Sequence, residues 1–324
     1  MGKGIAASGI RMTKARREAL ANNPNMSMDE LSNVYSPATF MINKWKNKET
    51  FSVPKVNYSA DVELLSSVIP ISKETDDEID LRLKDRFETL DMLVTACIEG
   101  NARSLIVSGP AGLGKSYTVE KRLSEWDSEQ KQHTIVHGYV RATGLVKLLY
   151  QYRHEGNVIV LDDADAIYYD DISLNLIKAV CDTTENRKVS WLSEAMLIDE
   201  ETAERIPRTF TFNGTVIFIT NLDFDAIITK GHKLAPHLQA LVSRSHYIDC
   251  GMKTKQDYMV RIHQVVKEGM LADLTYEQKN DVLAFLEENR DRLRELSLRM
   301  VVKIGNIRKS NANWRKLANI TCCK

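Results

Sequence analysis

The sequence has no run of about 18 apolar residues, so it contains no segment that could cross a membrane as a helix. Its first residues lack the apolar stretch of a secretory signal, and Ala6 stands where a myristoylation signal has Ser or Thr. The five cysteines are an odd number and none lies in a C-x-x-C pair, which argues against a disulfide framework or a zinc site. We therefore expect a cytoplasmic protein with reduced thiols.

The chain also lacks an excess of one charge, because 44 basic side chains balance 44 acidic ones. The balance hides an uneven distribution. Residues 1–60 hold nine basic and four acidic side chains, and residues 290–324 hold ten and two, so both ends are basic and the middle is acidic. Basic ends could meet nucleic acid, nucleotide phosphates or an acidic partner, or they could simply be solvated helix faces.

Length and composition predict an ordinary globular protein of two or three domains, because 43% of the 324 residues are apolar and 27% are charged. We interpret 1–60 as a basic N-terminal helical extension, 61–78 as a linker, 79–252 as an α/β domain and 253–324 as a helical domain. Within the extension, residues 26–49 could form a helix-turn-helix with Lys44, Lys46 and Lys48 on its last helix. The alternative is a small accessory helical element.

Five short apolar runs alternate with helical patterns in the α/β domain. They cover residues 104–108, 134–138, 158–162, 215–221 and 246–250. Such alternation predicts right-handed βαβ units and a parallel sheet. A helix is expected over 79–99, and three more over 254–269, 275–289 and 292–309, where no strand pattern remains. Thr275 and Gln278 form a capping box at the start of the second of these three.

Residues 109–116 read Gly-Pro-Ala-Gly-Leu-Gly-Lys-Ser and match the phosphate-binding pattern G-x-x-x-x-G-K-[ST]. A predicted strand precedes the loop and a predicted helix follows it, so backbone N–H groups and the helix dipole would surround a polyphosphate. We expect Lys115 to reach the β- and γ-phosphates and Ser116 to ligate Mg²⁺, which implies ATP and Mg²⁺ as the bound groups. The expected nucleotide-binding residues are Gly109, Pro110, Ala111, Gly112, Leu113, Gly114, Lys115, Ser116 and Tyr117.

Two carboxylates end the third predicted strand, whose sequence is Val-Ile-Val-Leu-Asp-Asp over residues 158–163. A buried parallel strand delivers them to the edge of the sheet where the phosphate loop lies. Asp162 is predicted to hold Mg²⁺ through water, and Asp163 to polarise the attacking water. Asp165, in the same acidic run, is expected to be a turn or helix-start residue.

The phosphate loop and acidic strand end are followed by VIFITN, LVSRSHYI and SLRMVVKIGNIRK, and this order resembles the AAA+ ATPase family. The sequences of these motifs are similar to those of AAA+ proteins of bacteriophages, which would place the chain in a host cytoplasm. The resemblance covers roughly residues 80–310. It implies a P-loop NTPase sheet of order 5-1-4-3-2 with a helical lid, and an enzyme that hydrolyses ATP as a homo-oligomeric ring or spiral.

The resemblance also implies three catalytic roles outside the two motifs. Asn221, which closes the fourth strand, would position the lytic water. Arg244 would be the arginine finger that reaches the γ-phosphate of a neighbouring subunit, and Arg299 would be the sensor arginine of the lid. The alternatives are Arg205 and Arg208 for the finger and Arg308 for the lid arginine.

One position departs from the family pattern, because most members have Glu where this chain has Asp163. Aspartate is one methylene shorter, so its carboxylate must approach the water differently. This predicts slow hydrolysis or a compensating shift of the sheet edge.

The sequence leaves open what the ATPase acts on. Tyr150 and Tyr152 could line a pore, or belong to a packing face with Leu145, Leu148 and Leu149. Residues 187–194 could form a short hairpin with Trp191 exposed. Three interpretations remain: a loader-type ATPase of DNA replication or recombination, a protein-remodelling ATPase, and a nucleotide-dependent switch or scaffold. The partners are therefore a second copy of the chain and either DNA or a protein substrate, with no membrane.

Overall fold

The computed structural model describes residues 74–324 apart from 194–195 and 200–201. The predicted extension over 1–60, with its possible helix-turn-helix carrying Lys44, Lys46 and Lys48, lies outside these residues. Most of the predicted linker lies outside them as well. None of the described helices is long and apolar enough to span a membrane.

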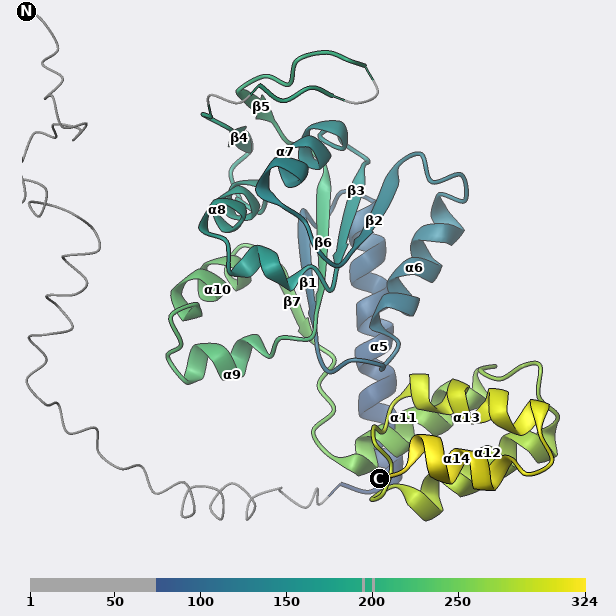
Figure 1. Ribbon diagram of the computed structural model, residues 1–324. Helices are drawn as coiled ribbons and strands as arrows, with labels where there is room; N and C mark the ends of the chain where they lie inside the picture. Colours follow the sequence, from purple (N-terminus) through teal and green to yellow (C-terminus); the bar gives the residue numbers. More distant parts are fainter. Residues whose placement is uncertain (1–73, 194–195, 200–201) are drawn as a thin grey trace, which may run out of the picture. The chain divides into compact units, whose positions relative to one another are not determined.

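A five-stranded parallel sheet forms the centre of the α/β part (Figure 1). Its strands are β1 (Ser104–Ser108), β2 (His133–His137), β3 (Val158–Asp162), β6 (Thr215–Thr220) and β7 (His246–Asp249). The order is β2-β3-β6-β1-β7, and every neighbouring pair is parallel. If the five strands of this sheet are numbered 1 to 5 along the chain, their order in space from the β7 edge is 5-1-4-3-2. Each boundary lies within one residue of the apolar run that predicted it.

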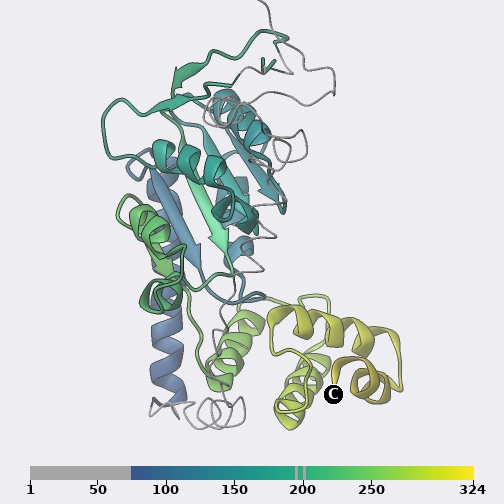
Figure 2. The same cartoon turned by 60° about the vertical axis from the view of Figure 1, so that its left-hand side comes forward.

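Every residue of the three central strands β1, β3 and β6 is buried, which explains why the interior positions of these strands are apolar. Successive side chains enter opposite layers. Ile159 and Leu161 join a cluster with α7 (Ala142–Gln151), α8 (Asp171–Val180), α9 (Phe224–Thr229) and α10 (Ala235–Val242). Val158 and Val160 join one with α5 (Asp76–Ile98) and α6 (Lys115–Trp126). Helices therefore cover both faces of the sheet (Figures 1 and 2).

Helix α5 is the predicted helix over 79–99, but it begins at Asp76. Thr75 and Glu78 form a capping box there, which adds a first turn that the apolar spacing alone does not reveal. Its buried side chains recur at helical spacing: Ile79, Leu83, Phe87, Leu90, Val94 and Cys97.

The C-terminal part is all helical and has its own apolar cluster. It consists of α11 (Lys255–Lys267), α12 (Tyr276–Asn289), α13 (Leu298–Ser310) and α14 (Trp314–Cys322). The capping box of Thr275 and Gln278 is confirmed. The helix expected over 292–309 begins only at Leu298, because Ser297 caps it and Leu293 pairs with Cys323 in a β-bridge. Helix α14 was not predicted.

The segment between α8 and β6 corrects one prediction. Strand β4 (Lys188–Ser190) pairs antiparallel with β5 (Thr209–Thr211), so a short hairpin confined to 187–194 is wrong. Trp191 is not exposed either. It packs against the core cluster, and its indole nitrogen is buried without a hydrogen-bond partner among the described residues. The apolar side chain is too large to leave in water when the neighbouring core offers a contact.

The two tyrosines considered for a pore belong to the packing face of α7. The Tyr150 ring meets Phe210 edge-on at 5.2 Å between ring centroids, and the Arg153 guanidinium lies 3.8 Å above it. Tyr152 also packs against the core cluster, together with Leu148. These contacts favour the packing alternative over pore contact.

Candidate nucleotide-binding site

The carboxyl ends of β1, β3 and β6 meet at one edge of the sheet. Ser108 pairs with Thr220 in the ladder, and Asp162 pairs with Ile219 one residue earlier. The chain therefore leaves the sheet at the phosphate loop, at Asp163 and at Asn221 within one small region. Ligand sites of open parallel sheets lie at this kind of edge.

The phosphate loop is held by its own lysine. The Lys115 ammonium donates to the carbonyl oxygens of Gly109 at 2.6 Å and Pro110 at 2.8 Å, and to Asn221 Oδ1 at 3.1 Å. Its side chain is 5% exposed, and burial lowers the pKa of the ammonium while Asp162 and Asp163 raise it. A buried cation thus stands ready at the edge of the sheet, which suits the capture of an anion.

Helix α6 begins inside this loop without a protein cap. Gly114 occupies the N-cap in the left-handed region (φ +95°), no side chain caps the first turn, and the first turn has no acidic residue. The positive end of the helix dipole and its first N–H groups are therefore available to a bound phosphate. Leu113 is buried in the layer beneath the loop, whereas Tyr117 is exposed.

Ser116 and Asp162 meet as predicted for a magnesium site. Ser116 Oγ donates to Asp162 Oδ1 at 3.1 Å, and Asp162 is buried at the end of β3. A hydroxyl and a carboxylate are oxygen donors of the kind that Mg²⁺ prefers, so these residues fit that ion. The second carboxylate oxygen faces a side chain that the sequence did not single out: His137 Nδ1 lies 3.1 Å from Asp162 Oδ2.

Asn221 links the predicted catalytic carboxylate to the loop lysine. Its amide nitrogen donates to Asp163 Oδ1 at 2.6 Å, and its amide oxygen accepts from Lys115. Asp163 takes a left-handed backbone conformation (φ +52°), which is uncommon for a residue other than glycine and turns the chain away from the strand direction. Asp165 begins the short 3₁₀ helix η1 (Asp165–Tyr168) and accepts from Thr220, so the helix-start expectation is confirmed.

The helical part touches the loop directly. The Leu298 N–H, at the start of α13, donates to the Gly112 carbonyl at 2.8 Å. Gly112 has φ +75°, and a Cβ there would lie 2.7 Å from Ser297 Cβ, so glycine is needed for both its conformation and its size. Packing of α13 therefore depends on the sequence of the phosphate loop.

A cavity of about 1010 Å³ lies between the loop, α5, α6, α11 and α13. It is large enough for a nucleotide. Among the sequence-predicted residues that line it are Ala111, Gly112, Leu113, Gly114, Lys115, Ser116, Tyr117, Asp163, Asn221 and Arg299. Gly109 and Pro110 contribute through the carbonyl groups that hold Lys115.

Arg261 also lines this cavity, although the sequence analysis did not select it. Its guanidinium lies 3.5 Å from the centroid of the Phe87 ring and donates to Gln264, and burial lowers its pKa. Its Nε is buried and has no partner among the described residues. An arginine inside the apolar spacing of α11 is the signal that could have identified it.

The other candidate arginines lie away from the cavity. Arg244 donates to the Ala240 carbonyl at 2.7 Å and lies 3.8 Å from Asp182, and its own carbonyl accepts from Ser104 at the amino end of β1. Arg308 pairs with Asp281 within the helical part. Arg205 and Arg208 belong to the segment around β4 and β5. A finger role for Arg244 in a neighbouring subunit stays a prediction.

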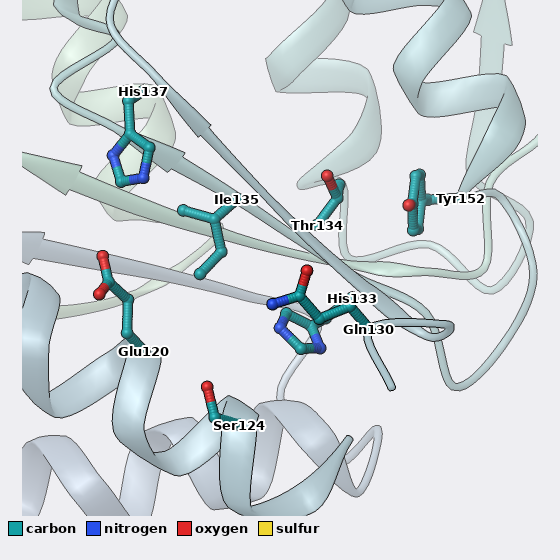
Figure 3. Close-up of a pocket in the computed structure, with 8 residues that line it drawn as sticks. All are labelled: Glu120, Ser124, Gln130, His133, Thr134, Ile135, His137 and Tyr152. Atoms are coloured by element: carbon teal, nitrogen blue, oxygen red, sulfur yellow. The ribbon is translucent and has the colours of Figure 1, made fainter. Parts of the chain in front are cut away.

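A second, smaller cavity of about 410 Å³ lies beside β2 and α6 (Figure 3). Its lining includes His137 and Glu120, and neither was singled out from the sequence. His137 ends the strand next to β3, so the rule that placed Asp162 at the sheet edge could have placed this histidine beside it.

Comparison with known proteins gives one close relative. No family model matches the chain. The chain is 36% identical over 270 residues to an uncharacterised 36.7 kDa protein from the nrdC-mobD intergenic region of Enterobacteria phage T4, and the match covers 81% of each protein.

The similarity to solved structures is more distant. NtrX from Brucella abortus, in complex with ATP, matches 93% of this chain and 66% of its own, with 12% identity and a TM-score of 0.39. PCH-2 from C. elegans matches 72% of this chain and 63% of its own, with 11% identity and a TM-score of 0.32. The chain thus spans slightly less than two thirds of either solved chain.

Proposed function

The chain belongs to the same family as the 36.7 kDa protein of Enterobacteria phage T4, and we propose that it is an AAA+-type ATPase that binds and hydrolyses ATP with Mg²⁺. The observation that carries the proposal is the network at the edge of the sheet, where Lys115, Asn221 and Asp163 are joined by hydrogen bonds. A phage relative also favours action in a host cytoplasm.

Each residue of the network has a distinct task in hydrolysis. Lys115 and the N–H groups at the start of α6 would bind the β- and γ-phosphates and stabilise the charge that develops in the transition state. Asp163 would accept a proton from the attacking water, and Asn221 would hold that water and the carboxylate in place. Mg²⁺ at Ser116 and Asp162 would neutralise phosphate charge.

The unusual aspartate is compatible with this chemistry. Asn221 holds the Asp163 carboxylate at 2.6 Å, and the left-handed backbone of Asp163 redirects its side chain at the end of β3. A shorter side chain therefore has a fixed position from which to orient water. This supports hydrolysis, in addition to the binding that the phosphate loop alone would provide.

We extend the proposal to an oligomer in which Arg244 acts on the nucleotide of a neighbouring copy. The support is its location: Arg244 adjoins the amino end of β1, whereas the phosphate loop follows the carboxyl end of that strand. Arg299, by contrast, lines the cavity of its own chain together with Lys115. It is the better candidate for sensing nucleotide in cis.

The macromolecule on which the ATPase acts is first proposed to be DNA, in a replication, recombination or loader-type step, because both ends of the chain are basic. The basic excess at residues 290–324 is partly neutralised within the fold. Three of its cations form ion pairs with acidic side chains of neighbouring segments: Arg308 with Asp281, Lys309 with Asp273 and Arg315 with Glu288. Less of the charge is therefore left for phosphates.

Remodelling of a protein is the second candidate, and a surface feature favours it. Between β4 and β5, the side chains of Leu192, Met196 and Ile198 are 79%, 66% and 53% exposed. Large apolar side chains gathered in one surface segment are typical of protein contact sites.

Two measurements test these proposals. The first is phosphate release from Mg·ATP with and without single- and double-stranded DNA. The second is the mass of the protein assembly in the presence of ATP. We expect hydrolysis, an oligomer with ATP, and stimulation by DNA that weakens steeply with salt. Hydrolysis without DNA binding at low salt would favour protein remodelling. Nucleotide binding without hydrolysis would indicate a switch or scaffold and would contradict the ATPase.

A further inference from the structure

Three side chains with metal-binding groups meet on the β2 side of Asp162. Glu120 comes from α6, His137 is the last residue of β2 and Asp162 is the last residue of β3. One ligand atom from each lies within 4.8 Å of the other two. In the part of the chain that the structure describes, it is the one group of three or more His, Cys, Asp or Glu side chains whose ligand atoms come this close together.

The group is anchored on one side and open on the other. Asp162 is buried, whereas the His137 side chain is 63% exposed. The cavity of about 410 Å³ beside β2 is lined by both His137 and Glu120. Figure 3 shows the imidazole and the carboxylate pointing toward each other at one end of it. An ion could therefore enter from solvent and keep water on its remaining positions.

The donor set selects a class of ion. Imidazole suits zinc and similar divalent transition metals, and hard ions such as Mg²⁺ prefer oxygen ligands alone. Bonds of about 2.0–2.2 Å to a tetrahedral ion place ligand atoms roughly 3.3 Å apart. The His137–Asp162 pair is already at 3.1 Å, and the Glu120 ligand atom lies within 4.8 Å of the other two, so a small side-chain movement is enough to complete the set.

The site is separate from the predicted magnesium site, although the two share a carboxylate. Asp162 Oδ1 accepts from Ser116, whereas Asp162 Oδ2 faces His137. We propose that Glu120, His137 and Asp162 bind a divalent transition metal of the zinc class, beside the phosphate loop and through the carboxylate oxygen that Ser116 does not use. A bound ion fixes the orientation of Asp162 and so couples metal occupancy to the nucleotide site.

The cysteines and His133 offer little competition for the ion. Residues 1–73 contain no histidine or cysteine. All five cysteines are buried, and burial raises the pKa of Cys97 to about 12 and the pKa of Cys181 and Cys250 to about 11, so their thiolates are scarce at neutral pH. His133 is buried against Asp127.

The experiment titrates the full chain with Co²⁺ alone, in the absence of nucleotide, and follows the visible absorption of the bound ion. We expect one equivalent to bind without a thiolate-to-metal band, and excess Mg²⁺ to leave it in place. His137→Ala and Glu120→Gln should each weaken binding about tenfold or more, since loss of even an outer partner of a metal site costs about that much. His154→Ala, an exposed histidine, and Glu125→Gln, on the same helix, should change nothing.

The Glu120→Gln variant separates a metal site from a mere hydrogen bond. If His137 only orients Asp162 through hydrogen bonding, Co²⁺ affinity will not depend on Glu120, and the proposal is overturned. Displacement of Co²⁺ by Mg²⁺, or equal losses in the control variants, would also overturn it. Thermal unfolding of each variant with and without Co²⁺ gives a second readout, because an ion that binds only the folded chain raises Tm in the wild type and not in His137→Ala.

Discussion

Asn221 donates a hydrogen bond to Asp163 at 2.6 Å from the end of the neighbouring strand, and so holds the carboxylate that takes the place of the usual glutamate. An asparagine at position 163 would keep this hydrogen bond, because its amide oxygen can still accept. It could not take a proton from water, because an amide is not a base at neutral pH.

We therefore expect Asp163→Asn to keep its affinity for ATP and to lower the rate of hydrolysis by about 100-fold or more, as is typical when a general base is lost. Phosphate release and nucleotide titration measure the two effects separately. Asp171→Asn, an exposed carboxylate in the first turn of α8, removes the same charge elsewhere and should leave both unchanged. Normal turnover in Asp163→Asn would remove the proposed water-polarising role.

Gly112→Ala should weaken ATP binding, because the new methyl group would meet Ser297 at 2.7 Å and push the start of α13 away from the phosphate loop. Overpacking of this kind costs about 1–3 kcal/mol, or roughly a five- to 150-fold loss of affinity if the cost is expressed in the bound form. Gly100→Ala is a matched control, since Gly100 also has φ +75° but no atom near its Cβ position. Equal nucleotide affinity in the two variants would mean that contact between α13 and the loop does not matter for binding.

Arg244→Ala should lower the ATPase rate of the assembled oligomer by about a thousandfold or more while leaving ATP affinity nearly unchanged, as expected for an arginine supplied in trans. The substitution also breaks the contact with Asp182. Asp182→Ala breaks that contact but retains the arginine, so it should hydrolyse ATP at close to the wild-type rate. Similar rates in the two variants would exclude Arg244 as the finger.

Asp127→Ala should destabilise the fold, because the Asp127 carboxylate accepts hydrogen bonds from the backbone of Lys131, Gln132 and His133 and from the His133 ring. Each buried donor that is left unpaired lowers the free energy of unfolding by about 1–3 kcal/mol. Burial alone would raise the pKa of this carboxyl, but the hydrogen bonds, led by that from Gln132, lower it to about 2.

The sign of that shift fixes the pH dependence. A carboxyl with a depressed pKa stabilises the folded state above its unfolded pKa and loses this contribution as pH falls toward about 2. Urea unfolding at pH 7 and at pH 3 should therefore show a difference between wild type and Asp127→Ala that shrinks at the lower pH. Asp85→Ala, on the exposed face of α5, should show no such change, and a constant difference for Asp127→Ala would contradict the assignment.

Local patterns were sufficient to predict the sheet and the phosphate loop. The apolar runs that became β1, β3 and β6 are buried throughout, and a strand followed by a glycine-rich loop and a helix has few alternatives. Because parallel strands end at one edge, the meeting of Ser116 with Asp162, and of Lys115 with Asn221, could be expected from sequence alone.

Contacts between distant segments were not predictable in this way. Arg261 reaches the candidate nucleotide cavity only because α11 packs beside α5, where its guanidinium covers Phe87. The need for glycine at position 112 depends on Ser297, the N-cap residue of α13, which lies far from the phosphate loop along the chain. Trp191 was expected at the surface because the strand that pairs with β4 lies beyond the segment that was considered, at 209–211.

The affinity of the full chain for Mg·ATP, compared between wild type and Lys115→Ala, tests the central claim most directly. Lys121→Ala is the control, since Lys121 lies on the same helix and lines the same cavity but has an exposed side chain. We predict that wild type and Lys121→Ala bind ATP alike and that Lys115→Ala binds at least about tenfold more weakly, as the loss of a hydrogen bond to a charged group implies. Unchanged affinity in Lys115→Ala, or no ATP binding by the wild type, would contradict the assignment of this site.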